Sequence, residues 1–429
     1  MRYGLIGEKL GHSFSKEIHE RIADYTYDLI PLSKEAFHAF MEKRDFTAIN
    51  VTIPYKKEVI PYLDEIDEHA KAIGAVNTIV NKEGKLIGYN TDFTGFHYMV
   101  KKHGVQMKGK KVLIIGNGGA SAAIQAVVQH EQAKQMIIVD VVAGNGAITY
   151  DECFLHHLDA EIIINTSPVG MYPHIGNTPI DITLFHKCEA VMDVIYNPIL
   201  TRFCLEAQNE GIKHVNGLEM LIAQAKQSVE YFLNKTIDDA IIDEIYQDML
   251  MKRCNIVLIG MPSSGKTTIG KMLAKRMQKE FIDLDDKIIE KAGKSIPEIF
   301  TESGEAGFRA IETEVAIELA KTNNKIIATG GGTVKHKVNM DYLRQNGITI
   351  FIDRDVDKLI SADPNRPLSS SKEALHKMYT ERIALYRKYA AYIAVNNTDI
   401  EETVSEIETA YHSILILSLI HISEPTRPY

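Results

Sequence analysis

Short apolar runs alternate along the chain with longer segments of helical pattern. Runs rich in isoleucine and valine cover residues 111–115, 136–139 and 161–164. Buried strands that are separated by helices pair in parallel, because each crossover helix returns the chain to the same edge of the sheet. The pattern therefore predicts an α/β fold built on parallel sheets. A chain of 429 residues is also too long for one hydrophobic core, so roughly two to four domains are expected.

A new buried strand over 255–259 follows a charged helical pattern that begins near Thr236. This change predicts a domain boundary near Met251, and the absence of a Gly/Ser-rich or Pro-rich linker predicts two closely joined units. Beyond residue 412 the stretch 413–422 is apolar without a helical amphipathic period, which favours a C-terminal strand. Residues 413–429 resemble a translated sequencing adapter more than a protein element, so we leave them out of the fold prediction.

The amino-acid composition excludes some classes of binding partner. The formal net charge of −9 argues against general affinity for nucleic acid or anionic lipid. No apolar run approaches the roughly 18 residues that a membrane span needs, and the N-terminus lacks a signal-peptide pattern, so we expect a cytoplasmic protein. The cysteines show neither disulfide-framework nor zinc-site spacing; they are Cys153, Cys188, Cys204 and Cys254.

The strongest single motif lies directly after the strand at 255–259. Residues 260–267 satisfy the pattern GxxxxGK[ST] and precede a helical pattern. In such a loop the glycines, here Gly260 and Gly265, let backbone N–H groups face phosphates at the positive end of a helix. Lys266 would reach the β and γ phosphates, and the Thr267 hydroxyl would bind Mg²⁺. The motif predicts ATP and Mg²⁺ as ligands.

Polar clusters that suit an acceptor follow this loop. Asp283 and Asp285 stand two apart at a predicted strand end and would share one face, where they suit a metal-bound water and substrate hydroxyls. Arg309 and Glu312 stand one helical turn apart, so the guanidinium could grip a carboxylate while Glu312 holds it. Three glycines at 330–332 end a strand and let a ligand approach the backbone.

In this order, together with the motifs at 365–368 and 381–387, the clusters resemble shikimate kinase over about residues 253–412. The resemblance implies a P-loop kinase domain over 252–412. It implies a shikimate pocket formed by Asp285, Arg309, Gly330, Gly331, Gly332 and Arg382. It also implies that Asp283 lies near Mg²⁺ and that Arg366, on a lid, approaches the phosphates and acts with Lys266. Ser263 replaces a glycine common in the family, and 358–364 lacks an arginine that often stacks on adenine, which puts adenine affinity in doubt.

The N-terminal half contains four polar clusters. Taken singly, each could consist only of helix caps or solvated side chains. Two serines stand at a predicted helix start, a threonine and a lysine stand where a strand ends and a helix is expected to open, and two further clusters close apolar segments. The residues are Ser13, Ser15, Thr52, Lys56, Asn77 and Asp92.

The order and spacing of these clusters resemble shikimate dehydrogenase from residue 1 to about 233. The resemblance implies a substrate-binding domain over 1–100 with 215–235 packing back on it, a Rossmann-like dinucleotide domain over 101–214, and a connecting helix over 236–251. It implies that Lys56 and Asp92 form the catalytic pair, because hydride reduction of a ketone leaves an alkoxide that needs a proton donor. It implies substrate contacts from Ser13, Ser15, Thr52, Asn77, Asp92 and Gln224. Tyr196 and Met220 would line the nicotinamide.

The dinucleotide loop has the GxGGA form that this family uses, with Gly116, Gly118, Gly119 and Ala120. The family expectation is NADPH. Asp140, at the end of the next strand, would instead repel a 2′-phosphate and accept from a free ribose hydroxyl, and no Lys or Arg follows before Lys187. NADH use or a relaxed preference is therefore our hypothesis. The segment 141–159 is shorter than usual for the family and should hold a trimmed helix.

Together these readings predict two consecutive reactions: reduction of 3-dehydroshikimate to shikimate, then ATP- and Mg²⁺-dependent phosphorylation of shikimate at its 3-hydroxyl. Two alternatives stay open. The first is an NAD-dependent quinate or shikimate dehydrogenase working in the oxidative direction, which Asp140 favours. The second is a kinase-like half that binds nucleotide only to regulate the dehydrogenase, against which the intact Lys266, Asp285, Arg309 and Arg382 argue. The oligomeric state stays undetermined.

Overall fold

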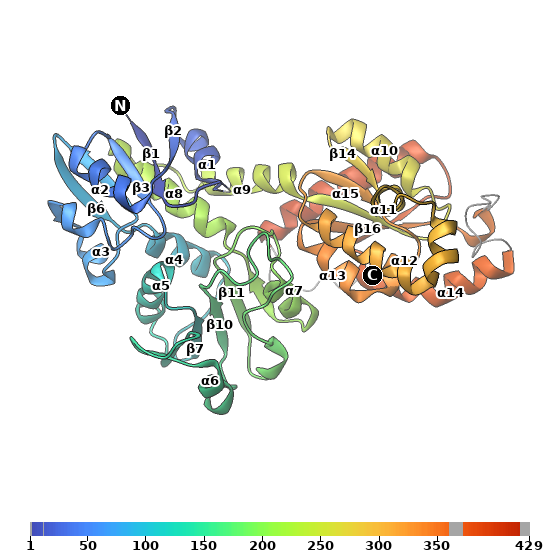
Figure 1. The fold of residues 1–429 in the computed structure, drawn as a ribbon, viewed down its shortest axis with the longest axis horizontal. Helices are drawn as coiled ribbons and strands as arrows, with labels where there is room; N and C mark the ends of the chain where they lie inside the picture. The colour runs from blue at the N-terminus through green and yellow to red at the C-terminus, as the bar shows by residue number, and fades with distance from the viewer. Residues whose placement is uncertain (1, 12, 360–371, 421–429) are drawn as a thin grey trace.

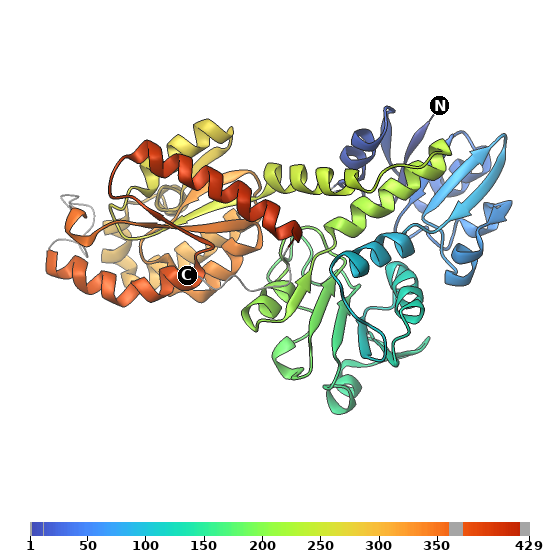
Figure 2. The same cartoon turned by 180° about the vertical axis from the view of Figure 1, so that it is seen from behind.

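The computed structural model describes residues 2–11, 13–359 and 372–420. Within these residues the strands form three sheets, two in the N-terminal half and one in the C-terminal half (Figures 1 and 2). The α/β fold with parallel sheets is thereby confirmed. No helix of the described residues is long and apolar enough to cross a membrane.

The first sheet is mixed. Its order is β2 (Tyr27–Pro31), β1 (Tyr3–Gly7), β3 (Ala48–Val51), β5 (Thr78–Lys82), β6 (Lys85–Tyr89) and β4 (Glu65–Ile66). β1, β2 and β3 are parallel, whereas β5 runs antiparallel to both β3 and β6. Its helices are α1 (Ser15–Ile22), α2 (Lys34–Lys43) and α3 (Glu68–Ile73), with a 3₁₀ turn η1 (Ile60–Tyr62). The ends of β3 and β6 carry the polar residues of the first candidate site.

The second sheet is wholly parallel. Its order is β12 (Lys213–Val215), β11 (Ala190–Asp193), β10 (Ile162–Asn165), β7 (Lys111–Ile115), β8 (Gln135–Val139) and β9 (Ala147–Ile148). Its other elements are α5 (Gly119–His130), α6 (Tyr150–His156), η2 (Ile182–Leu184) and α7 (Arg202–Asn209). The chain winds outward from β7 in both directions, and ligands of such sheets bind beyond the carboxyl end of this switch-point strand. The helix in 141–159, α6, has only seven residues.

Two helices join these sheets. α4 (Asp92–Lys102) leads from the first sheet to the second, and α8 (Leu218–Leu233) packs along it. Gly95 permits the close crossing, because a Cβ there would lie 2.6 Å from the carbonyl oxygen of Met220. Asp92 at the start of α4 is thus fixed between the two sheets.

The C-terminal half contains the third sheet, also parallel. Its order is β14 (Glu280–Asp283), β15 (Lys325–Ala328), β13 (Asn255–Ile259), β16 (Gly347–Asp353) and β17 (Tyr392–Val395). The helices around it are α10 (Lys266–Met277), α11 (Leu284–Ala292), α12 (Ile296–Ala320), α13 (Lys337–Gln345), α14 (Lys372–Tyr389) and α15 (Ile400–Ile420), with 3₁₀ turns η3 (Thr333–Lys335) and η4 (Val356–Lys358). The glycine loop after the central strand β13 opens α10.

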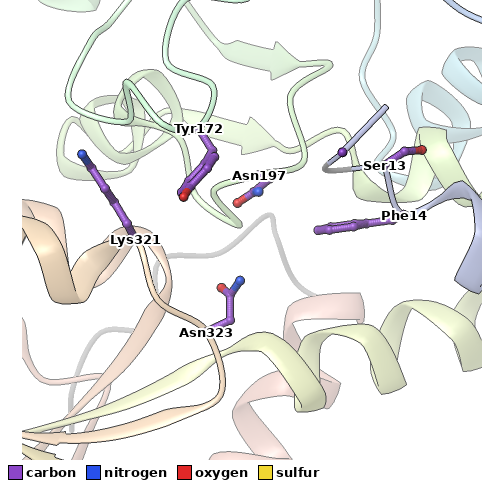
Figure 3. Close-up of a pocket in the computed structure, with 7 residues that line it drawn as sticks. Ser13, Phe14, Tyr172, Asn197, Lys321 and Asn323 are labelled. Atoms are coloured by element: carbon purple, nitrogen blue, oxygen red, sulfur yellow. The ribbon is translucent and has the colours of Figure 1, made fainter. Parts of the chain in front are cut away.

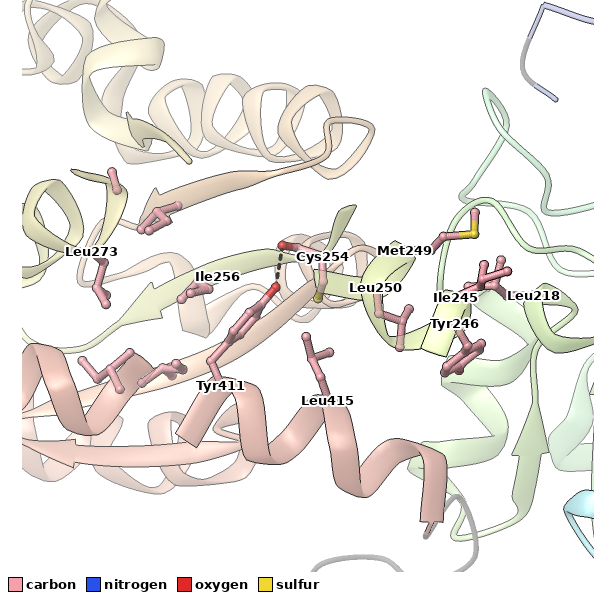
Figure 4. Packing of buried hydrophobic residues seen from close by; sticks show 14 of the residues in the cluster. Leu218, Ile245, Tyr246, Met249, Leu250, Cys254, Ile256, Leu273, Tyr411 and Leu415 are labelled. Atoms are coloured by element: carbon pink, nitrogen blue, oxygen red, sulfur yellow. Dashed lines mark hydrogen bonds between the residues drawn. The ribbon is translucent and has the colours of Figure 1, made fainter. Parts of the chain in front are cut away.

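The two halves share one hydrophobic cluster along α9 (Ala240–Arg253), which lies between them (Figures 1 and 4). Leu218 of α8 and Tyr411 of α15 belong to the same cluster, and the Tyr411 hydroxyl donates to the Cys254 carbonyl at 3.0 Å. Ion pairs Arg21–Asp248 and Arg253–Glu17 flank it. The halves are therefore packed against each other rather than loosely tethered.

The predicted C-terminal strand is wrong, because α15 continues as a helix to Ile420. Its buried residues Val404, Ile407, Tyr411 and Leu415 recur at helical spacing. This stripe begins before residue 413, so the helical register of the tail is set by the segment that precedes it. Residues 421–429 lie outside the described part of the chain.

Two candidate active sites

The first site centres on an ion pair between Lys56, which follows β3, and Asp92, which opens α4. The Lys56 Nζ donates to the Asp92 Oδ2 at 2.6 Å. The two side chains are only 14% and 9% exposed, so solvent screens their attraction weakly. The arrangement fixes an ammonium group at the carboxyl edge of the first sheet.

Asn77 holds the second oxygen of the same carboxylate. Its Nδ2 donates to the Asp92 Oδ1 at 2.9 Å, while its Oδ1 accepts from the Thr91 backbone N–H at 2.8 Å. The Asn90 side chain accepts from the Asp92 N–H at 3.0 Å. Both oxygens of Asp92 therefore have protein partners, and Asn77, expected to contact substrate, also positions this carboxylate.

A buried network of polar side chains lies next to Asn77 and Asp92 and holds the segment that carries them. The Asn50 Nδ2 donates to the Ser228 Oγ at 2.9 Å, and the Thr91 Oγ1 lies 3.1 Å from the same oxygen. Thr91 also donates to the Gln224 Oε1 at 3.3 Å. Sequence reasoning missed the roles of Asn50 and Ser228 here, because their partners are far apart in the chain.

Ser13 lies just before α1 and Ser15 is the first residue of that helix; the Ser13 Oγ donates to the Ser15 Oγ at 3.0 Å. Thr52 follows β3, but the helix predicted after it is wrong, since hydrogen-bonded turns and η1 occupy that stretch. The Tyr55 ring is fully buried and stacks on Phe37 with centroids 4.2 Å apart. Long-range packing therefore overrides the local helical pattern.

The glycine loop after β7 comes close to this ion pair. Gly116 has φ +96°, and a Cβ there would lie 3.0 Å from the Ser167 backbone nitrogen, so this position favours glycine. Gly118 caps α5, in which Gly119 and Ala120 form the first turn. A Cβ on Gly119 would lie 3.5 Å from the Cδ of Lys56. The structure thus places the start of a dinucleotide-type helix beside the Lys56 side chain.

Asp140 is part of the loop's own structure. Its carboxylate accepts from the Asn117 N–H at 2.9 Å and from the Val141 N–H at 2.7 Å. Val141 and Val142 are 79% and 73% exposed. The surface beyond β8 therefore presents apolar side chains. The segment that follows supplies no cationic side chain, because residues 141–186 contain neither Lys nor Arg.

The second site is a cavity of about 790 Å³ at the edge of the third sheet. It gathers most of the residues predicted for this half: Gly265, Lys266, Thr267, Asp283, Asp285, Arg309, Gly330, Gly331, Gly332 and Arg382. Gly260 lies behind the loop, where its carbonyl accepts from the Lys266 Nζ at 2.9 Å. Arg366 lies outside the described residues.

The phosphate loop curls around the Lys266 side chain, whose Nζ also donates to the Met261 carbonyl at 2.7 Å. Gly265 has φ +101°, and Ser263, the residue that departs from the family, has φ +62°. Ser263 therefore adopts the left-handed conformation that glycine takes more easily.

Thr267 and Asp283 form an oxygen-rich pair, with the Thr267 Oγ1 donating to the Asp283 Oδ2 at 2.9 Å. The prediction that Asp283 and Asp285 share a strand end is wrong. Asp283 ends β14, whereas Asp285 lies in the first turn of α11 and donates its N–H to the Asp283 Oδ1 at 3.1 Å. Hydroxyl and carboxylate oxygens are the ligands that Mg²⁺ prefers, so Thr267 and Asp283 fit this ion.

Arginines give the other side of the cavity an excess of donors. The Arg309 Nη1 donates to the Glu312 Oε2 at 2.9 Å, and the Arg382 Nη1 donates to the Gly331 carbonyl at 2.9 Å. Glu312 is buried and accepts from Thr333 at 2.7 Å. Within the described chain the buried Nε atoms of Arg309 and Arg382 have no hydrogen-bond partner. Unsatisfied cationic donors on a cavity wall favour an anionic ligand.

Comparisons with known proteins agree with these geometries. Residues 5–79 match the family model of the shikimate dehydrogenase substrate binding domain. A shikimate dehydrogenase (NADP(+)) of Clostridium perfringens is 35% identical over 266 residues, which cover 58% of this chain and 97% of that protein. The chain belongs to the shikimate dehydrogenase family. Residues 262–411 match the shikimate kinase model, so a shikimate kinase domain follows the dehydrogenase and the chain combines an oxidoreductase with a phosphotransferase.

Two solved structures resemble the dehydrogenase part. A chorismate mutase/shikimate 5-dehydrogenase fusion protein from Clostridium acetobutylicum has 39% identity and a TM-score of 0.54, covering 58% of this chain and 96% of that one. A quinate dehydrogenase from Corynebacterium glutamicum, solved in complex with NAD, has 26% identity and a TM-score of 0.51, covering 58% and 99%.

The remaining residues predicted for the dehydrogenase lie around its core. Tyr196 packs against Phe14 with ring centroids 5.1 Å apart. Met220 is 7% exposed and belongs to the cluster beneath α4 and α5. The Gln224 Nε2 donates to the Leu221 carbonyl of its own helix at 2.8 Å. Ala120 of the glycine loop packs against the cluster to which Met220 belongs.

Sequence reasoning missed part of the kinase cavity. Arg354, directly after β16, lines it, as do Phe300 and Phe308, whose stacked rings form an apolar wall. The sequence could have predicted that Arg354 lines the cavity, because residues that follow neighbouring parallel strands meet at one edge of the sheet. The aromatic wall depends on the packing of α12, which the sequence pattern does not locate.

Proposed function

We propose that the dehydrogenase reduces 3-dehydroshikimate to shikimate and that the kinase domain phosphorylates the 3-hydroxyl of shikimate. The carrying observation is that one chain holds the Lys56–Asp92 pair beside a dinucleotide-type helix and an arginine-lined phosphate-loop cavity. The proposed division is 1–100 with 215–235 for substrate, 101–214 for dinucleotide, 236–251 as the connector and 252–412 for the kinase. A cytoplasmic location belongs to the same proposal.

In the dehydrogenase the glycine loop at the start of α5 would hold the dinucleotide, which when bound would supply the hydride for the ketone carbon. Lys56 would give a proton from Nζ to the oxygen that becomes a hydroxyl, and Asp92 holds the ammonium group in position. Ser13, Ser15 and Thr52 hydrogen-bond the carboxylate and hydroxyls of the substrate. Gln224 completes this set from α8.

In the kinase domain the loop N–H groups and Lys266 hold the phosphates of ATP, and Thr267 with Asp283 would hold Mg²⁺, which neutralises phosphate oxygens. Asp285 binds the acceptor hydroxyls, and Arg309 with Arg382 grips the carboxylate. Phosphoryl transfer depends mainly on positioning and charge stabilisation, and this lining provides both. We keep Arg366 as a proposed phosphate contact.

Incubation of the full chain with 3-dehydroshikimate, reduced nicotinamide cofactor, ATP and Mg²⁺ tests the proposal. We expect shikimate 3-phosphate to accumulate, with shikimate alone when ATP is left out. Dehydrogenation of quinate with NAD⁺, without phosphoryl transfer, would instead support the oxidative alternative, which Asp140 favours. Reduction without any phosphorylation of added shikimate would support a purely regulatory kinase domain.

The second prediction concerns the preference of the dehydrogenase for NADH or NADPH. Asp140 and the neighbouring valines offer no cation for a 2′-phosphate, so we propose that NADH is used at least as efficiently as NADPH. Side-by-side kcat/KM values with the two cofactors measure this. Asp140→Asn should shift the ratio toward NADPH, because it removes a negative charge while keeping an oxygen acceptor; a wild-type preference for NADPH would contradict the proposal.

A further inference from the structure

A second cavity, of about 300 Å³, lies where the dehydrogenase meets the kinase domain (Figure 3). The dehydrogenase contributes the loop before α1 and two loops of the dinucleotide part, and the kinase domain contributes the segment between α12 and β15. Its lining includes Ser13, Phe14, Tyr172, Asn197, Lys321 and Asn323. The cavity is therefore built from both enzymes.

The lining has the character of a site for a small hydroxylated anion. Lys321 contributes an ammonium group, and no acidic side chain lines the cavity. Among the described residues no carboxylate forms an ion pair with Lys321, whereas Lys325, four residues later, pairs with Glu280. The remaining side chains offer amide and hydroxyl groups, which suit the hydroxyls of a polyol acid. One ammonium matches the single charge of a carboxylate better than the double charge of a phosphate.

The cavity also lies at the substrate end of the dehydrogenase. Ser13 is hydrogen-bonded to Ser15, and both are proposed substrate contacts. The kinase side is held firmly against this loop, because the Arg253 guanidinium lies 4.2 Å from the centroid of the Phe14 ring and pairs with Glu17. Figure 3 shows Lys321 extending toward the loop of Tyr172, with Asn323 opposite Asn197.

From this geometry we propose that Lys321 and Asn323 of the kinase domain form an outer wall of the dehydrogenase site and bind the carboxylate of the incoming hydroxylated acid. The inference rests on the proposed function of the first site. Lys321 lies within residues 262–411, which match the shikimate kinase model rather than the dehydrogenase. A stand-alone dehydrogenase would lack this cation, so the kinase domain here would act as a specificity element for its neighbour.

The test measures both activities of the full-length protein carrying Lys321→Gln. We expect the KM for 3-dehydroshikimate to rise about three- to tenfold with kcat nearly unchanged, as for loss of one partly exposed charge contact. The dependence of this KM on salt should also weaken. Lys321→Arg should restore most of the affinity, and the kinase KM values for shikimate and ATP should stay at wild-type levels.

Lys275→Gln is the matched control, because it removes an exposed lysine of the same domain away from the cavity. Lys321 also follows the last residue of α12, where a cation stabilises a helix terminus. That structural role alone would lower the thermal midpoint without changing the salt dependence of KM. An unchanged dehydrogenase KM in Lys321→Gln would overturn the inference while leaving the proposed function intact, whereas a wild-type protein without dehydrogenase activity would overturn the proposed function itself.

Discussion

Lys56→Ala should lower the dehydrogenase kcat by about 100- to 10,000-fold with little change in KM. The ammonium gives its proton only as the alkoxide develops, so its loss removes an interaction of the transition state rather than of substrate binding. The 2.6 Å contact with Asp92 and the low exposure of both groups mean that bulk water cannot readily take over this role. Steady-state rates of nicotinamide oxidation measure the effect.

Lys57→Ala is the natural control, since Lys57 is the exposed neighbour in the same turn and should retain wild-type kcat. Phosphorylation of shikimate by the Lys56→Ala protein reports whether the chain is folded, because that activity resides in the other half. A kcat within a few-fold of wild type in Lys56→Ala would remove Lys56 from the proton-transfer role.

Lys266→Ala should lower the kinase kcat/KM by about 100- to 1,000-fold and leave dehydrogenation intact. Lys266 is the cation at the centre of the phosphate loop, and a single preorganised charge or donor at a transferring group typically contributes this much. The side chain also ties the loop through the carbonyls of Gly260 and Met261, so ATP affinity should fall as well. Initial rates at varied ATP and shikimate separate the two effects.

Lys271→Ala, in the same helix but exposed, removes a like charge and should keep kinase activity near wild type. If Lys266→Ala phosphorylated shikimate at the rate of the Lys271→Ala protein, the assignment of the phosphate site would be untenable.

Much of the architecture was predictable because it rests on local signals. The glycine loop around Gly116 and the phosphate loop ending at Thr267 each follow a buried strand and open a helix, as their patterns indicate. The Arg309–Glu312 pair could be inferred from helical spacing alone. These features need only the covalent order of a few residues and the period of one element.

The errors arose where distant parts of the chain decide the outcome. The turn after Thr52 follows the burial of Tyr55 against Phe37, which no short window reveals. Asp285 lies in a helix because Asp283 caps it and ends the strand earlier than expected. The strand interpretation of residues 413–422 fails because the buried apolar stripe from Val404 to Leu415 begins in the helix before residue 413.

The cluster that passes through α9 means that neither half has a complete surface of its own. Cutting the polypeptide between α8 and β13 would leave Leu218 on one fragment and Tyr411 on the other without the apolar side chains that now cover them. Each fragment would then expose a hydrophobic surface to solvent and tend to aggregate. Because the two enzymes form one polypeptide and share this cluster, they are synthesised and degraded together. Their ratio is therefore fixed at one to one without any control of expression.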